Sequence, residues 1–293
     1  MIRVMKVNFL MVFCFVLLGM LASTASVIAQ EEGLDKANQA KEFYNQGIQA
    51  TQDGDPEAAI RFYSMAVSLD PDYVDCYLNL GAIHFGRGEF DEALDQFEKA
   101  ADKAPQNIDA LANMGRVRYR LKQNVEAQES FEAALAIDPE NGPILMELGK
   151  VQYKQRDYEG AIVSLEKGHA AGSGDHASFL YLGKSYQKMG KQDKAIVALQ
   201  KSIEHKSANY SAHSALGLIY HQQEKFLKAA TEYKAALKAN PKKGFRASYN
   251  YASAMEEANP DDRDQNIANW EAFVKLAKNN PKAKNDVAIA QDH

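Results

Sequence analysis

Apolar and small residues recur at helical spacing between residues 40 and 243, and the whole pattern repeats every 34 residues. Counting each unit from residue 40, a large side chain usually stands at positions 7 and 24, and small residues stand at positions 8 and 20. Position 8 is glycine in every unit: Gly47, Gly81, Gly115, Gly149, Gly183 and Gly217. Position 20 is alanine in every unit: Ala59, Ala93, Ala127, Ala161, Ala195 and Ala229. Two packed helices need a small residue where their axes approach and a large one where the gap opens, so each unit is predicted to be a helical hairpin.

The ends of the units are marked by proline. Position 32 is proline in four units: Pro71, Pro105, Pro139 and Pro241. Proline lacks the N–H that a helix interior requires, so it is expected to end the second helix of a unit before the next unit begins. The predicted units are 40–73, 74–107, 108–141, 142–175, 176–209 and 210–243. A period in this range is typical of stacked helical repeats.

Taken together, Leu-Gly at positions 7–8, Ala at 20, Phe, Tyr or Leu at 24, Ala at 27 and Pro at 32 resemble the tetratricopeptide repeat. The resemblance covers residues 40–243, although the tryptophan usual at position 4 is absent and His213 stands there in the sixth unit. It implies an all-α fold, a right-handed superhelical α-solenoid of stacked helix–turn–helix repeats. Such arrays present extended binding surfaces. We expect His213 to be a core or rim histidine with one hydrogen bond.

Three further segments complete the predicted organisation. Residues 30–39 are a short lead-in, residues 244–281 form a degenerate seventh repeat that caps the array, and residues 282–293 are a polar tail that frays or forms a short helix. The junction between units 4 and 5 carries three glycines in residues 168–174 and no proline. We expect a longer loop there, with a hinge as the alternative.

The N-terminus has the pattern of an export signal. After Arg3 and Lys6 no charged residue occurs until Glu31, and the apolar run 9–22 is followed by small residues. This pattern predicts a secretory signal peptide cleaved after Ala29, and a periplasmic location. Because the uncharged stretch is long enough to span a bilayer, an uncleaved membrane anchor with the repeats outside the cytoplasm is the alternative.

Charge and cysteine content narrow the partners. Two of the 34 basic residues lie in 1–29, so the remainder has 32 basic and 39 acidic residues and a net charge of −7. That balance argues against general nucleic-acid binding. The same removal leaves Cys76 as the one cysteine, so no internal disulfide is expected.

No pattern for catalysis is present in the sequence. It lacks a phosphate-binding loop, an HExxH motif, a CxxC pair and a GxSxG motif. The glycines at 172 and 174 imitate part of a dinucleotide fingerprint, but they lie in a repeat turn with no preceding strand. We therefore predict a non-catalytic protein without metal or cofactor.

The candidate binding surface comes from the resemblance, which implies that positions 2, 5, 6, 9, 12 and 13 line a concave groove. Positions 9 and 13 are basic in units 3 to 5: Arg116, Arg120, Lys150, Lys154, Lys184 and Lys188. Aromatic residues stand beside them: Tyr119, Tyr153 and Tyr181. Residues at i and i+4 share a helix face, so stacking would join the pairs into a basic stripe suited to an acidic peptide segment or a carboxylate terminus. The alternative is a set of solvated lysines and arginines without a partner.

A second candidate is a ladder of amides at position 6 in units 1 to 3. These residues are Asn45, Asn79 and Asn113. An amide side chain both donates and accepts hydrogen bonds, so such a ladder can hold a peptide backbone without reading its sequence.

The sequence therefore predicts a protein–protein interaction scaffold of the bacterial cell envelope that holds peptide segments or partner proteins in its groove. One alternative is a small-ligand receptor or an enzyme accessory subunit that uses the same groove, where a deep closed cavity would replace an open trough. Another is self-association through the degenerate end, with Trp270 and Phe273 exposed.

Overall fold

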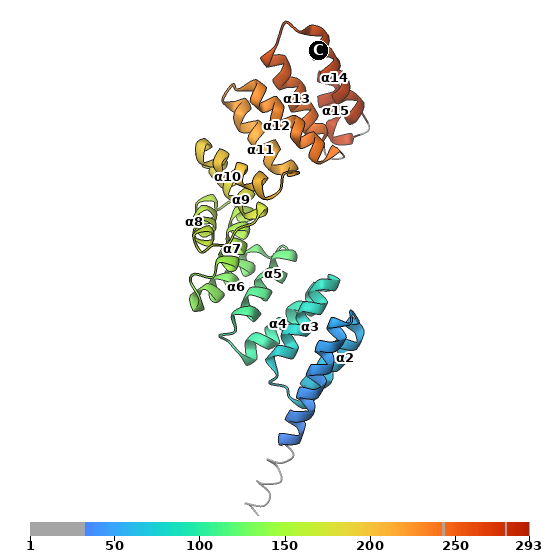
Figure 1. Cartoon of the computed structure of the whole chain (residues 1–293), viewed down its shortest axis with the longest axis vertical. Coiled ribbons are helices and arrows are strands. Elements are labelled where there is room, and N and C mark those ends of the chain that lie inside the picture. The colour runs from blue at the N-terminus through green and yellow to red at the C-terminus, as the bar shows by residue number, and fades with distance from the viewer. Residues whose placement is uncertain (1–32, 242–243, 279, 293) are drawn as a thin grey trace, which may run out of the picture. The chain divides into compact units, whose positions relative to one another are not determined.

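The structure is a computed structural model that describes residues 33–241, 244–278 and 280–292 (Figure 1). Over those residues it is all-α and contains no strand, as predicted. The first described helix covers residues 33–52, so the lead-in is helical from residue 33 onward. The later helices are α2 (Pro56–Leu69), α3 (Val74–Arg87), α4 (Phe90–Lys103), α5 (Ile108–Arg120), α6 (Asn124–Ile137), α7 (Gly142–Gln155), α8 (Tyr158–Ala170), α9 (His176–Lys188), α10 (Gln192–His205), α11 (Tyr210–Gln222), α12 (Phe226–Ala239), α13 (Phe245–Ala258), α14 (Arg263–Ala277) and α15 (Lys284–Asp292). The predicted export segment, 1–29, lies outside the described residues.

The helices keep the period of the sequence. The first helix of a unit begins at residues 74, 108, 142, 176 and 210, and the second at residues 56, 90, 124, 158, 192 and 226. Side chains at the helix starts help to fix this phase, because an Asn or Asp before the helix accepts a backbone N–H that has no intrahelical partner. Asn107, Asn141, Asp157, Asp175 and Asn209 do so.

The predicted close approach at position 8 is confirmed within the repeats. A Cβ built on Gly81 would lie 2.6 Å from Cε1 of Phe97, and one built on Gly183 would lie 2.6 Å from Cγ of Leu199. The residue at position 24 therefore presses directly onto the glycine of its own hairpin. This contact explains why position 8 stays glycine while position 24 stays large in every unit.

Position 15, in the turn between the two helices of a unit, has a positive φ in every repeat. The angles are 74° at Gly54, 79° at Gly88, 64° at Lys122, 69° at Arg156, 72° at Gly190 and 58° at Glu224. The left-handed residue lets the next N–H reach back to position 11, as Asp157 N–H does to Gln152 O at 2.9 Å and Lys191 N–H to Tyr186 O at 2.9 Å.

The chain divides into two compact units, residues up to Leu121 and residues from Lys122 onward, and each is described by itself. The boundary falls inside the third repeat, with α5 in the first unit and α6 in the second. The first unit packs around Tyr63 and Cys76 and around Phe97 and Val117. Burial raises the pKa of the Cys76 thiol to about 12, so this cysteine is a core residue with little thiolate at neutral pH.

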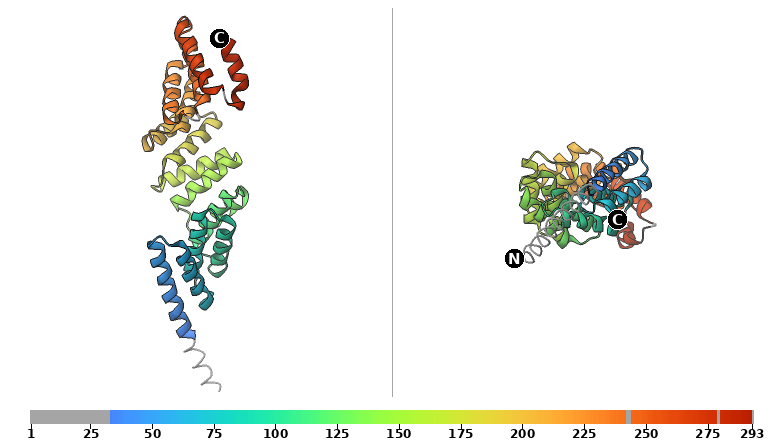
Figure 2. Two further views of the ribbon diagram at one scale, coloured as in Figure 1. Left: turned by 90° about the vertical axis from the view of Figure 1, so that its right-hand side faces the viewer. Right: turned by 90° about the horizontal axis from the view of Figure 1, so that it is seen from below.

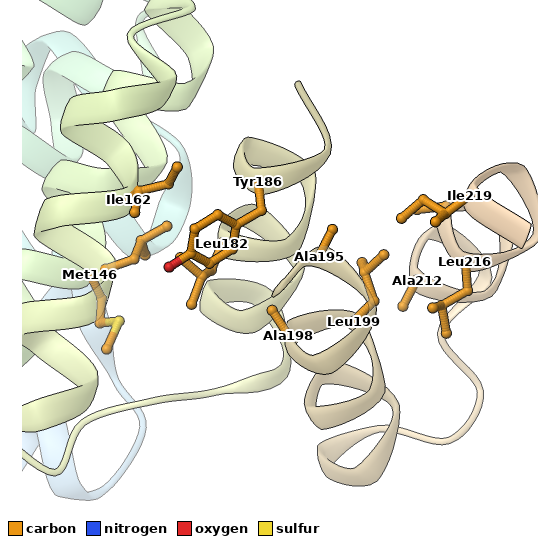
Figure 3. Packing of buried hydrophobic residues seen from close by; sticks show 12 residues of the cluster. Met146, Ile162, Leu182, Tyr186, Ala195, Ala198, Leu199, Ala212, Leu216 and Ile219 are labelled. Atoms are coloured by element: carbon orange, nitrogen blue, oxygen red, sulfur yellow. The ribbon is translucent and has the colours of Figure 1, made fainter. Parts of the chain in front are cut away.

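In the second unit the core is continuous across several hairpins (Figure 3). Met146 and Ile162 of the α7–α8 hairpin contact Leu182 and Tyr186 of α9, while Leu199 of α10 leads on to α11. Each hairpin thus covers the apolar face of the next, which is the packing expected of stacked repeats.

The junction between α8 and α9 is an ordered turn. Gly172 has a φ of 76°, and Ser173 N–H donates to Gly168 O at 3.1 Å. The connection from α8 to α9 spans residues 171–175, whereas the connection from α2 to α3 spans only residues 70–73. It is one residue longer because α8 ends one residue earlier in its repeat than α2 does. The expected longer loop is confirmed.

The C-terminal helices bury the two aromatic residues, Trp270 and Phe273, that the self-association alternative requires to be exposed. Trp270 is 4% exposed and Phe273 is fully buried, and both rings pack against Tyr249 of α13. The polar tail forms α15, which lies beside α14 (Figure 2). Ala290 of α15 is buried. The expectation that Trp270 and Phe273 stay exposed for self-association is wrong, because α13 to α15 cover them.

Candidate functional site

The predicted groove residues of the second unit lie on two helices in contact, α7 and α9. Their side chains are Lys150, Tyr153 and Lys154 on α7, and Tyr181, Lys184 and Lys188 on α9. The rings of Tyr153 and Tyr181 lie 5.2 Å apart at 60°, and Tyr153 also meets Tyr158 at 5.6 Å. Burial, followed by these two tyrosines, raises the pKa of Tyr153. An aromatic cluster therefore links the two repeats.

Two cations flank that cluster. The ammonium of Lys154 lies 5.8 Å from the ring centre of Tyr181, which is within the range of a cation–π contact. Burial lowers the pKa of Lys184, and the nearby charge of Lys154 lowers it further. Among the described residues neither lysine has a carboxylate within 4 Å. We call Tyr153, Lys154, Tyr181 and Lys184 the basic–aromatic surface.

Lys150 and Lys188 differ from that group. The side chain of Lys150 is only 15% exposed and pairs with Glu147 at 3.1 Å, three residues earlier on α7. Its charge also acts on Asp175 at the start of α9. Lys188 is exposed at the end of α9. Lys150 thus has an anion within its own repeat, unlike Lys154 and Lys184.

The remaining predicted cations lie in the first unit. Arg116 donates from Nη1 to Asn113 Oδ1 at 2.6 Å. The guanidinium of Arg120 lies 4.7 Å from the ring centre of Phe90 and 5.6 Å from that of Phe85. Both arginines therefore already contact side chains of their own unit, and Tyr119 beside them is half-buried. Arg116 and Arg120 thus form a basic patch of the first unit, whereas the lysines belong to the second unit.

The three predicted amides also lie in the first unit. Asn45 is exposed on helix 33–52, and Asn79 is half-buried on α3, where it hydrogen-bonds to Tyr44. The oxygen of Asn113 accepts from Arg116, which leaves its N–H donors for other partners.

His213 has more contacts than expected. Nδ1 lies 2.7 Å from Glu232 Oε2 and Nε2 lies 2.9 Å from Ser207 O, so both ring nitrogens face an acceptor. The hydrogen bond to Glu232 raises the pKa of His213, although burial opposes this. The expected single hydrogen bond is corrected to two, and the doubly protonated ring satisfies both.

A pocket of about 770 Å³ lies elsewhere, between α8, the 172–174 turn, α9 and α10, and the sequence did not predict it. Its lining includes His169, Phe179, Leu182, Tyr186, Val197 and Lys201. None of the predicted groove residues lines it. Histidines near this repeat junction were the one sequence signal for the pocket. They did not predict it, because His169 and His205 meet on the Phe179 ring only in the folded protein.

The described part of the chain has neither a cluster of metal-binding side chains nor a helix fit to span a membrane. Within residues 33–241, 244–278 and 280–292, no three His, Cys, Asp or Glu side chains are grouped as metal ligands. Over the same ranges, every helix is too short or too polar to cross a bilayer.

Comparison with solved structures supports the fold. MamA is 26% identical with a TM-score of 0.52, over 56% of this chain and 96% of that protein. The tetratricopeptide-repeat protein YrrB is 22% identical with a TM-score of 0.54, over 61% of this chain and 92% of its own. A tetratricopeptide repeat protein from Parabacteroides merdae is 15% identical with a TM-score of 0.60, over 87% and 99%.

The search of curated proteins gave no match. A family model does match residues 19–259, which is most of the chain, and it agrees with the 34-residue period, the glycine–position 24 contact and the solved neighbours. The chain belongs to the tetratricopeptide-repeat family described as the Cilia and flagella-associated protein 70 C-terminal domain.

Proposed function

We propose that this protein is a non-catalytic scaffold that binds an extended acidic segment of a partner protein on the basic–aromatic surface of α7 and α9. The observation that carries the proposal is the pair Lys154 and Lys184, whose charges repel each other beside two tyrosine rings and have no carboxylate within 4 Å among the described residues. The neighbour YrrB is described as a protein with an unusual peptide-binding site, which supports a peptide as the occupant.

Charge complementarity explains why an acidic segment fits. A carboxylate placed between the ammonium groups of Lys154 and Lys184 offsets their mutual repulsion and the cost of burying Lys184. The tyrosines add apolar area and hydroxyl groups, which suit a segment that carries both acidic and apolar side chains. The chain as a whole is net acidic, at −5, so an acidic segment is attracted to this basic surface and repelled by most of the remaining surface.

The test is binding of a labelled peptide of alternating Asp, Glu and Phe to the full-length protein, measured by fluorescence anisotropy at 50 and 200 mM salt. The expected result is binding that weakens with salt and weakens at least tenfold in Lys154→Glu and in Lys184→Met. Two controls are matched to it. A peptide with Asn and Gln in place of Asp and Glu is expected to bind much more weakly, and Lys167→Glu, a charge reversal on the exposed side of α8 outside this surface, is expected to bind like the parent.

Equal binding of the acidic and amide peptides would overturn the proposal, as would unchanged binding in folded Lys154→Glu and Lys184→Met. Circular dichroism establishes folding for each variant.

We also propose an exported location for the scaffold, in the periplasm, either free after cleavage behind Ala29 or held by an uncleaved anchor. The support is the uncharged run between Lys6 and Glu31. N-terminal sequencing of the protein recovered from fractionated cells separates the two forms, and recovery of the intact chain in the cytosolic fraction would exclude both.

A further inference from the structure

The pocket between α8 and α10 lies on the side of α9 away from the basic–aromatic surface. Phe179, Leu182 and Tyr186 line the pocket, whereas Tyr181 and Lys184 belong to the other surface. At roughly 100° per residue these two sets point to nearly opposite faces of the helix. The volume of about 770 Å³ is in the range of small-ligand sites. The pocket is therefore a separate candidate site.

One end of the pocket is aromatic and cationic. The ring of Phe179 stacks with His169 at 3.9 Å and 8°, and with His205 at 5.2 Å and 28°. The ammonium of Lys201 lies 5.6 Å from the centre of the same Phe179 ring. Across the described segments of the chain, no carboxylate lies within 4 Å of that ammonium.

Lys201 is the strongest charge acting on this end of the pocket. The pKa of His169 is lowered, first by burial and then by the charge of Lys201, and His205 lowers it further. Asp175 and Glu166 act in the opposite direction and do not reverse the shift. After burial, the charge of Lys201 is thus the strongest single influence on the pKa of His169, ahead of either carboxylate.

Hydrogen bonds fix the protonation of His169. The hydroxyl of Ser178 donates to Asp175 O at 2.8 Å, so its oxygen is left to accept. Nε2 of His169 lies 3.2 Å from that oxygen, and it is the donor when the hydroxyl proton is directed to Asp175 O. In the neutral ring Nδ1 then carries the lone pair, and protonation there adds a second N–H donor.

The middle of the pocket is apolar, and its far end carries charges of both signs. Leu182, Val197 and Ala198 line the middle, with Val197 54% exposed. At the far end the Tyr186 hydroxyl donates to Glu166, and Lys194 lies 5.4 Å from the Tyr186 ring centre. The pocket thus combines an apolar body, a cationic end at Lys201, and a far end where Glu166 and Asp193 accompany Lys194.

We propose that this pocket binds an aromatic carboxylate, with the carboxylate beside Lys201 and the ring against Leu182 and Val197. Such a group is found in a free aromatic acid and in the C-terminal aromatic residue of a peptide. The site is independent of the groove, because it uses a different face of α9 and different lysines.

The experiment measures binding to the full-length protein by isothermal titration calorimetry at pH 6.0 and pH 8.0. The probes are N-acetyl-phenylalanine, its amide, a five-residue peptide ending in phenylalanine, and that peptide with an amidated end. We expect both acids to bind at least tenfold more tightly than their amides, and more tightly at pH 6.0 than at pH 8.0, because a carboxylate favours the protonated form of His169. Tighter binding of the peptide than of the amino-acid acid identifies a peptide terminus, and the reverse order identifies a free acid.

Variants connect the binding to the pocket. Lys201→Glu is expected to weaken both acids at least tenfold, and Lys201→Met by less. Lys167 occupies the same repeat position on α8 but does not line the pocket, so Lys167→Glu is the matched control and should bind like the parent. Lys154→Glu should also bind like the parent, which separates this site from the proposed groove. Equal affinity for acids and amides, no binding of either acid at millimolar concentration, or normal binding by folded Lys201→Glu would overturn the proposal.

Discussion

At the scale of single residues, the left-handed position 15 is occupied by glycine in three repeats and by Lys122, Arg156 and Glu224 in the others. A side chain in this conformation costs about 1–2 kcal/mol, whereas glycine costs roughly 0.5–1 kcal/mol of extra chain entropy on folding. Arg156→Gly and Glu224→Gly are therefore each expected to raise the free energy of unfolding by about 0.5–1 kcal/mol in urea titrations.

The reciprocal change supplies the control. Gly88→Ala places a Cβ at a φ of 79°, in open space, so its cost comes from the backbone alone. It is expected to lower the free energy of unfolding by about 1 kcal/mol. If Arg156→Gly is destabilising while Gly88→Ala is neutral, the backbone argument fails.

The contact between His213 and Glu232 makes a second prediction, about pH. Because the pKa of His213 is raised in the folded protein, the fold binds this proton more tightly than the unfolded chain does. The resulting stabilisation is complete below the ordinary histidine pKa of about 6.5 and is lost as the pH rises through the higher folded value. The parent protein should lose more stability than His213→Gln between pH 6 and pH 8.5.

Urea titrations at several pH values measure that difference, and an NMR titration of His213 reports its pKa directly. Glu232→Gln serves as the partner control and should lower the pKa of His213. Parallel stability profiles for the parent and His213→Gln would show that this ion pair does not contribute.

At the scale of the helix, Gly183 on α9 tests the packing inside one hairpin. A Cβ there would lie 2.6 Å from Leu199 Cγ and 3.2 Å from the backbone oxygen of Ala195, which cannot move away easily. Gly183→Ala is expected to lower the free energy of unfolding by about 1–3 kcal/mol. Combined with Leu199→Ala it should cost less than the sum of the two changes, because the smaller side chain leaves room for the methyl group.

Gly86→Ala is the matched control for that prediction. Gly86 lies inside α3 with no heavy atom within 4 Å of an added Cβ, so alanine there gains helix propensity without a clash. It should raise the free energy of unfolding by about 0.5–1 kcal/mol. A similar change of stability in both variants would show that the contact with Leu199 does not determine the cost at Gly183.

The helices show which features a sequence carries and which it does not. The phase of the hairpins was predictable because the glycine, alanine and proline positions each constrain a helix contact or a helix end. The left-handed turn was not recognised, because Lys122, Arg156 and Glu224 interrupt the glycine pattern there. Two further features depend on tertiary contacts that no local pattern marks: the burial of Trp270 by α13 to α15 and the pocket around Phe179.

At the scale of the whole molecule, stability in a repeat array is expected to be local, because each hairpin contacts mainly its neighbours. The contacts of α9 are with α7, α8, α10 and α11, and the core around Leu182 and Leu199 ends at those helices. A lesion at Gly183 should therefore speed amide hydrogen exchange in residues 142–222 and leave residues 33–121 at the parent rate.

Gly81→Ala provides the opposite case, because an added Cβ there meets the Phe97 ring at 2.6 Å inside the first unit. It should speed exchange in residues 56–121 and spare residues 176–222. Hydrogen exchange followed by mass spectrometry resolves both patterns on the full-length chain. If the effects are local, substitutions in the two proposed sites on α9 leave the first unit undisturbed. Faster exchange along the entire chain in either variant would instead show that the repeats unfold as one cooperative body.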